Sequence, residues 1–208
     1  MDQTLDQITA TNPAARPAGT AGARILALLA VLGGVGLLVA MVTMFGALMR
    51  TPPLTWAGLW ADPVLGVVMF VGATGGFIAL CVALAGLGLA IGLARDPRVA
   101  SVAALGAIGG DFGVLGFPVG FLAMPPAALI VAIHLVRIGR LPTSVAVLHA
   151  TAGVGSIVVG ALWAQNASLG LGDLIVFLYP VSWIAIGLAV FRGLPSRESS
   201  ASSPALGR

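Results

Sequence analysis

The chain contains no lysine, and all ten of its basic residues are arginine. Charged residues of both signs make up only 8% of the 208 residues, whereas hydrophobic residues make up 59%. This small number of polar side chains cannot cover the surface of a soluble globular protein. The composition therefore excludes that class and indicates an integral membrane protein. The arginines lie in pairs between apolar segments, which argues against a phosphate-binding patch and therefore against a nucleic-acid partner.

Cysteine is nearly absent too. The single cysteine, Cys81, lies inside an apolar stretch and has no partner in the chain for a disulfide bond. We interpret it as a small buried hydrophobic residue. The sequence contains neither a Cys-x-x-Cys nor a Glu-x-x-His motif, two patterns typical of metal sites. No metal ion or other cofactor is therefore predicted.

What the chain has in abundance is long apolar stretches separated by short polar segments. A helix needs roughly 17–25 such residues to cross the bilayer core. Four stretches each correspond to one membrane-spanning helix. They run over Ile25–Met49, Val64–Leu93, Thr143–Trp163 and Leu171–Phe191.

A fifth stretch, Val99–Val136, is long enough for two spans, and its only charged residue is Asp111. A single span would place the arginine pairs that flank it on opposite sides of the membrane, whereas two spans place them together. We expect two spans joined by a tight turn near Gly116–Pro118. Because Pro125 and Pro126 lie early in the fourth span, that helix must begin late or be broken there.

This interpretation gathers nine of the ten arginines on one side and leaves only Arg50 on the other. Basic residues near span ends are retained in the cytoplasm during insertion, so the arginine side is predicted to be cytoplasmic. The predicted fold class is all-α: a polytopic membrane helix bundle of six transmembrane helices with both termini cytoplasmic. Residues 24–192 form the transmembrane domain, flanked by disordered cytoplasmic tails over residues 1–23 and 193–208.

Glycine is plentiful, with 29 residues. Pairs of small residues four apart, such as Gly72 with Gly76 and Gly106 with Gly110, allow membrane helices to approach closely. In a chain so rich in glycine, such pairs also arise by chance.

Tryptophan marks the predicted membrane surfaces. Trp56, Trp60 and Trp163 lie near the outer ends of spans, where indole rings favour the headgroup region, and we predict that they are interfacial anchors. Trp56 and Trp60 lie four residues apart on one helix face, so a ligand-stacking pair is the alternative. Trp183 is expected deeper, among the helices.

Asp111 is the one acidic residue far from any predicted span end. It follows Arg98 by thirteen residues, which places it about 20 Å along a helix at roughly 1.5 Å per residue. A carboxylate at this depth is costly and commonly serves proton or cation passage. The alternative is a neutral carboxyl that donates a hydrogen bond near the start of the fourth span.

Three further polar residues are candidates for function. His134 and His149 flank the arginine turn on adjacent spans and are candidate haem or metal ligands, but their depths differ. Packed or interfacial histidines are the alternative. Tyr179 begins a locally polar part of the sixth span, where Pro180 frees the carbonyl of Val176 and either Ser182 or a neighbouring helix could compensate. Such a kink either lines a permeation path or is a packing feature.

Six glycine- and alanine-rich spans, arginine in place of lysine, and the turn Arg137-Ile-Gly-Arg140-Leu-Pro142 together resemble a group of six-helix membrane proteins of actinobacteria. The resemblance covers the whole chain. It implies a multi-pass protein of a bacterial plasma membrane, and it brings no activity or site residue with it.

The sequence therefore predicts a membrane protein without catalytic activity, acting as a structural, accessory or immunity-type partner of another membrane component. Its expected partners are the lipid bilayer and a membrane protein or a second copy of the chain. The alternative is a small proton- or cation-coupled transporter or channel-like protein that uses Asp111. An enzyme is not favoured, because the sequence shows no paired acids and no serine with a histidine or lysine base at matched depth.

Overall fold

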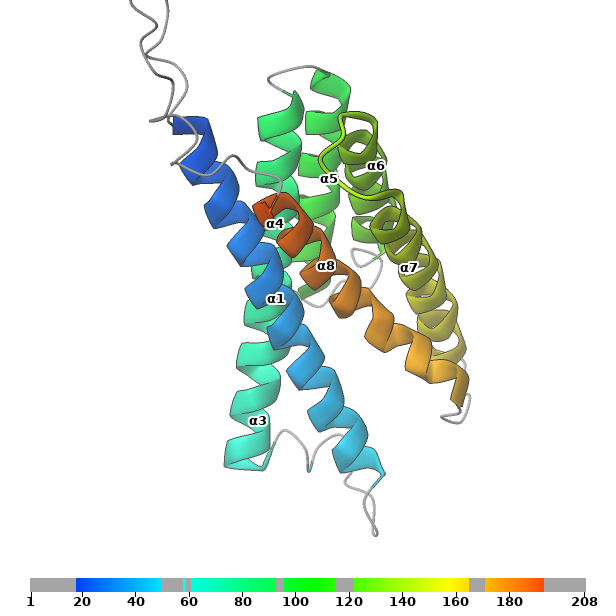
Figure 1. Ribbon diagram of the computed structural model, residues 1–208. Coiled ribbons are helices and arrows are strands. Elements are labelled where there is room, and N and C mark those ends of the chain that lie inside the picture. The colour runs from blue at the N-terminus through cyan, green and yellow to red at the C-terminus, as the bar shows by residue number, and fades with distance from the viewer. Residues whose placement is uncertain are drawn as a thin grey trace, which may run out of the picture.

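The protein is described here by a computed structural model, which covers residues 18–49, 58, 61–92, 96–114, 122–164 and 171–192. Every regular element in these residues is helical, and none is a strand, so the predicted all-α class is confirmed (Figure 1). The α-helices are α1 (Ala18–Leu48), α3 (Pro63–Met69), α4 (Gly76–Gly92), α5 (Pro97–Val114), α6 (Met124–Arg137), α7 (Thr143–Ala164) and α8 (Leu178–Arg192). A π-helix, η2 (Phe70–Gly75), and a 3-10 helix, η4 (Leu171–Phe177), complete the list.

These elements form six helical rods, because α3, η2 and α4 are continuous in sequence, as are η4 and α8. Within the described residues, three of them are long and apolar enough to cross a membrane: Ala21–Ala47, Pro63–Ala90 and Leu174–Arg192. Met124–Arg137 and Thr143–Val159 are shorter apolar helices. The six rods correspond to the six predicted segments.

Two helices begin at positions that bear on the sequence predictions. α1 begins at Ala18, directly after Pro17 and inside the segment predicted as a disordered tail. α6 begins at Met124 with both prolines in its first turn, where a missing N–H removes no hydrogen bond. The prediction that this helix begins late is therefore confirmed. The predicted turn near Gly116–Pro118 lies outside the described residues, as do residues 1–17 and 193–208 of the predicted tails.

The helices form a ring in which each one packs against the next in sequence. α1 contacts α4, then α4 contacts α5, α5 contacts α6, α6 contacts α7 and α7 contacts α8. α8 crosses back over α1 and closes the ring (Figure 1). The shared core holds the fully buried side chains of Leu80, Leu84, Met124 and Trp183.

Glycines let α1 touch its two neighbours backbone to backbone. A Cβ atom built on Gly33 would lie 2.7 Å from the carbonyl oxygen of Gly76 on α4. One built on Gly34 would lie 2.7 Å from the carbonyl oxygen of Pro180 on α8. No side chain fits in either gap, so α1 is held between α4 and α8 by contacts that only glycine permits.

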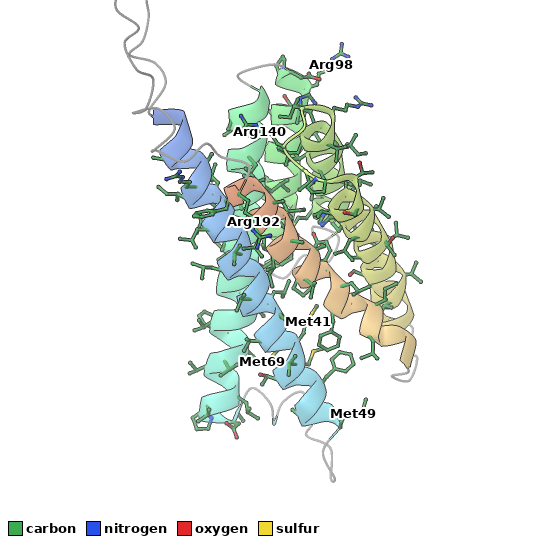
Figure 2. The ribbon with its side chains drawn as sticks, viewed as in Figure 1. Met41, Met49, Met69, Arg98, Arg140 and Arg192 are labelled. Atoms are coloured by element: carbon green, nitrogen blue, oxygen red, sulfur yellow. The ribbon has the colours of Figure 1, made fainter. Side chains whose placement is uncertain are left out.

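The arginines of the described residues gather at one end of the bundle. Arg98 and Arg140 lie toward that end and Arg192 lies deeper in the same half of the bundle, whereas Met49 lies toward the opposite end (Figure 2). Arg24 is close to the start of α1, which lies at the arginine end (Figure 1). The charge asymmetry of the sequence is thus an asymmetry of the folded molecule.

Candidate functional site

A polar cluster lies between α7 and α8, inside the ring. His149 comes from α7, and Tyr179, Ser182 and Trp183 come from the first two turns of α8. His149 and Ser182 are both completely inaccessible to solvent. We call these four residues the His149 cluster.

The spacing along α8 explains why three of these residues meet His149. Tyr179, Ser182 and Trp183 are separated by three and four residues, so they share one face of an α-helix. Pro180 is in the first turn, just after the 3-10 helix η4 ends. The serine hydroxyl donates to the carbonyl of Tyr179 at 2.6 Å, and not to that of Val176 as the sequence had suggested.

The hydrogen bonds of Ser182 determine where the proton of His149 lies. Its hydroxyl has one hydrogen, which is donated to the Tyr179 carbonyl because a carbonyl can only accept. The imidazole Nδ1 of His149 lies 2.7 Å from the same hydroxyl oxygen. Nδ1–H must therefore be the donor in this second bond. In the neutral imidazole, Nε2 then carries no proton and is a hydrogen-bond acceptor.

Two aromatic rings enclose the imidazole. The ring centroid of Tyr179 lies 5.4 Å from that of His149 at an interplanar angle of 33°. The Trp183 ring meets His149 edge to face, with centroids 5.3 Å apart. These distances are in the range of favourable aromatic pairs, so the rings help to fix the imidazole orientation.

Polar atoms of the cluster remain unsatisfied within the described part of the chain. The Nε2 atom of His149 is buried and has no hydrogen-bond partner there. The Tyr179 hydroxyl and the Trp183 indole N–H lie near each other without reaching hydrogen-bond geometry. One acceptor and two potential donors in an apolar interior can hold a small polar molecule or pass a proton.

His134 lies apart from this cluster. It is on α6, half-buried, and no described residue forms a hydrogen bond with its buried Nε2 atom. No hydrogen bond or ring contact joins it to His149, which instead contacts Ser182, Tyr179 and Trp183. The described residues also hold no group of three or more His, Cys, Asp or Glu side chains suited to a metal ion.

Asp111 is in the last turn of α5, and its side chain is outside the described part of the structure. The neighbouring Gly110 shows what this level of α5 faces. A Cβ atom on Gly110 would lie 2.6 Å from the Cys81 sulfur and 3.6 Å from the Met124 sulfur. This turn of α5 therefore packs against α4 and the start of α6, at the level of Pro125.

The predicted tryptophan anchors fall mostly outside the described residues. Trp56 and Trp60 lie outside them altogether, and for Trp163 only the backbone, in the last turn of α7, is described. Trp183 is 1% exposed, which confirms the expectation that it lies among the helices.

The sequence indicates His149 and Tyr179 as candidate residues but does not predict that they are in contact. The sequence indicates this contact in part, because polar residues in a membrane interior must find partners and Ser182 lies one turn from Tyr179. The ring closure that brings α7 against α8 supplies the rest. No protein-family model, curated protein or solved structure matches this chain.

Proposed function

We propose that this chain is a multi-pass protein of a bacterial plasma membrane, with six membrane-crossing helices and the arginine end in the cytoplasm. Three long apolar helices support the membrane assignment. Apolar side chains on the outside of α1, α3, α5 and α7 suit a lipid environment. The gathering of Arg98, Arg140 and Arg192 at one end supports the orientation, because basic ends stay cytoplasmic.

Within that membrane, we propose a non-catalytic role as a structural, accessory or immunity-type partner of another membrane component. One observation carries this proposal: exposed apolar residues recur on the outward face of α1 at alternating spacings of three and four residues. The repeat consists of exposed apolar residues Ile25, Leu28, Leu32, Val35, Val39 and Val42. We call it the α1 stripe. A strict three–four repeat over several turns is the pattern with which one helix packs along another.

The partner role is tested by photo-crosslinking in native membranes. A photoreactive residue at Leu32 or Val39, both on the α1 stripe, is expected to crosslink to one membrane-protein species or to a second copy. The matched controls are Leu105 and Ile108, which are exposed apolar residues of α5 outside the stripe. Crosslinks only to lipid from both faces, or the same products from both, would reject the partner role.

The second candidate is a small proton- or cation-coupled transporter or channel-like protein. The His149 cluster favours it, because the buried imidazole has an Nε2 atom with no hydrogen-bond partner among the described residues, and polar atoms of this kind inside a helix bundle can line a proton path. Asp111 belongs to the same proposal as a second titratable group.

Proteoliposomes with a trapped pH indicator separate the two candidates. The transporter role requires that an imposed ion or proton gradient moves protons faster than in protein-free liposomes. It also requires that His149→Phe or Asp111→Asn removes this flux while the protein stays folded. Flux no greater than in protein-free liposomes would leave the partner role alone.

A further inference from the structure

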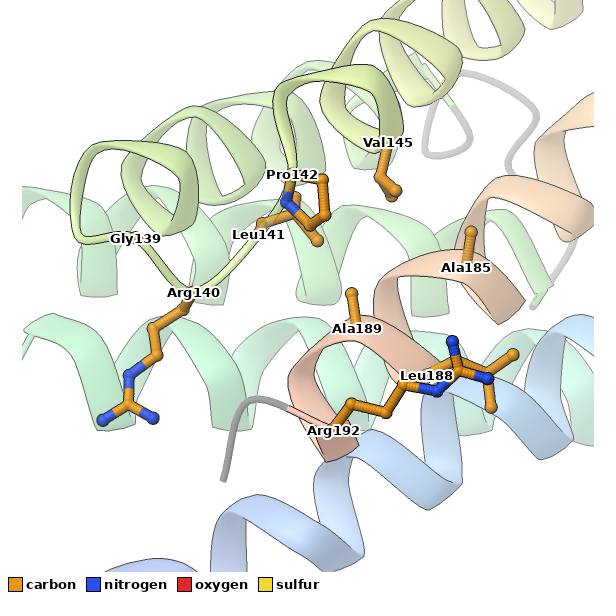
Figure 3. A pocket seen from close by; sticks show the side chains of 9 residues that line it. All are labelled: Gly139, Arg140, Leu141, Pro142, Val145, Ala185, Leu188, Ala189 and Arg192. Atoms are coloured by element: carbon orange, nitrogen blue, oxygen red, sulfur yellow. The ribbon is translucent and has the colours of Figure 1, made fainter. Parts of the chain in front are cut away.

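A pocket of about 680 Å³ opens at the arginine end of the bundle, between the turn after α6 and the last two turns of α8 (Figure 3). Residues 139–142 and Val145 line one side. Ala185, Leu188, Ala189 and Arg192 line the other. The volume is in the range of pockets that bind small molecules, roughly 300–1,000 Å³.

The lining is apolar except for two guanidinium groups. Leu141, Val145 and Leu188 provide hydrocarbon walls, and none of the nine lining residues is acidic. Arg140 and Arg192 line the pocket from two different elements, the turn and the end of α8, and their guanidinium groups point away from each other (Figure 3). The pocket thus pairs hydrocarbon surface with two fixed positive charges.

The backbone of the turn holds Arg140 in place. Gly139 adopts a left-handed conformation, with φ of 70°, and its N–H donates to the Val136 carbonyl at 2.9 Å. The Arg140 N–H donates to the Leu135 carbonyl at 2.8 Å. These two bonds form a Schellman motif, which ends α6 in a defined geometry and fixes where Arg140 leaves the helix.

The depth of Arg192 adds to this. α8 ends short of the ends of α4 and α5, and Arg192 lies farther from the arginine end of the bundle than Arg98 does (Figures 1 and 2). α7 also begins beside the pocket, at Thr143, and its N-terminus adds partial positive charge. An anionic group drawn to these charges would therefore sit partly below the outermost arginine.

We propose that this pocket binds an anionic phospholipid, with the side chains of Arg140 and Arg192 turning toward its headgroup phosphate and an acyl chain along Leu188 and Val145. The two arginines would also attract a free phosphate ion. The hydrocarbon walls favour a lipid, because a phosphate ion gains nothing from them whereas an acyl chain does. Basic pockets between membrane helices are a recurring way to hold acidic headgroups. The inference requires only that the helices lie in a bilayer, and it is independent of the partner role.

Native mass spectrometry of the full chain tests the site. The protein is purified in a mild detergent and titrated separately with phosphatidylglycerol, phosphatidylcholine and inorganic phosphate. We expect saturable binding of phosphatidylglycerol, much weaker binding of phosphatidylcholine, and no displacement of bound phosphatidylglycerol by inorganic phosphate.

Matched variants assign the binding to the pocket. Arg140→Gln and Arg192→Gln should each lower the phosphatidylglycerol affinity about fivefold, the effect of one basic residue on an anionic headgroup. Arg98→Gln is the control, since Arg98 is exposed at the same end but does not line the pocket. Ala189→Phe narrows the apolar side without changing any charge and should also weaken binding, while circular dichroism reports that each variant keeps its helices.

Three results would overturn the proposal. An equal loss in Arg98→Gln would mean that surface charge in general, and not the pocket, attracts the lipid. Equal affinity for phosphatidylcholine would remove the role of the anionic headgroup. Displacement by inorganic phosphate would reassign the pocket to a soluble anion. None of these results bears on which partner the α1 stripe contacts, so the two proposals fail separately.

Discussion

At the scale of single residues, the proton on His149 is fixed by its neighbour. Ser182 has one hydrogen and two bonds to satisfy, so Nδ1 of His149 must be the protonated nitrogen. The same geometry leaves Nε2 as a buried acceptor. In a histidine held in this way, one ring nitrogen anchors the side chain through a hydrogen bond, and the other can accept a hydrogen bond from a ligand.

The tautomer can be measured directly by nitrogen NMR. We expect one histidine in the ¹⁵N spectrum to show a protonated Nδ1 and an unprotonated Nε2, because Ser182 accepts from Nδ1. The chain has only two histidines, so the His134→Gln variant assigns the remaining signal to His149. A protonated Nε2 with a bare Nδ1 would contradict the assignment.

Loss of the serine hydroxyl should destabilise the bundle. Ser182→Ala leaves the buried Nδ1–H of His149 without its acceptor, which should lower the free energy of unfolding by about 1–3 kcal/mol. Ser101→Ala is the control: Ser101 donates to the Pro97 carbonyl at 3.2 Å but is exposed. Thermal unfolding in detergent compares the two, and equal effects would count against the importance of the buried bond.

The sequence could predict which residues at this scale matter, but not how they pair. His149 and Tyr179 were identifiable because polar groups are costly within a membrane. Their meeting depends on the angle at which α8 crosses the ring, and nothing in the spacing of residues along one helix encodes that angle. The Schellman motif at Gly139 is local, and its glycine followed by a proline within three residues is a readable sign of a helix end.

At the scale of elements, α1 depends on glycine on two sides. In its contacts with α4 and α8, carbonyl oxygens of those two helices occupy the space that side chains at Gly33 and Gly34 would fill. The sequence predicts the existence and approximate limits of the six helical rods, because hydrophobicity and charge set both. It does not predict the π-helical turn over Phe70–Gly75, which has no periodic signature of its own.

Enlarging one of these glycines should separate the helices. A side chain at Gly34 would begin 2.7 Å from the Pro180 carbonyl and 2.8 Å from a carbon of Ile184. We expect Gly34→Leu to cost about 1–3 kcal/mol or more, the usual cost of overpacking. Gly46→Leu is the matched control on the same helix, since nothing lies within 4 Å of a Cβ there. Thermal unfolding should separate the two variants clearly, and equal stability would argue against the close approach.

At the scale of the whole molecule, the arrangement of the arginines gives a testable orientation. Reporter fusions after Arg98 and Arg140 should both report the cytoplasm, and a fusion after Phe117 should report the outside, because basic span ends stay cytoplasmic. If the fusions after Arg98 and Arg140 report opposite sides, the double span over Val99–Val136 is wrong.

The closed ring also has a consequence for biosynthesis. Five of its contacts join helices that are consecutive in the chain, so those helices can pair as they leave the ribosome. The sixth joins α8 to α1, the last helix made to the first. Until α8 is inserted, the face of α1 around Gly34 lacks its contact with Pro180, and His149 lacks its hydrogen bond with Ser182. The first helix of the nascent protein must therefore stay in the membrane without its last neighbour until translation is nearly complete. A ribosome that stops before Leu178 releases a product in which this face of α1 is exposed, and cellular quality control can recognise that face.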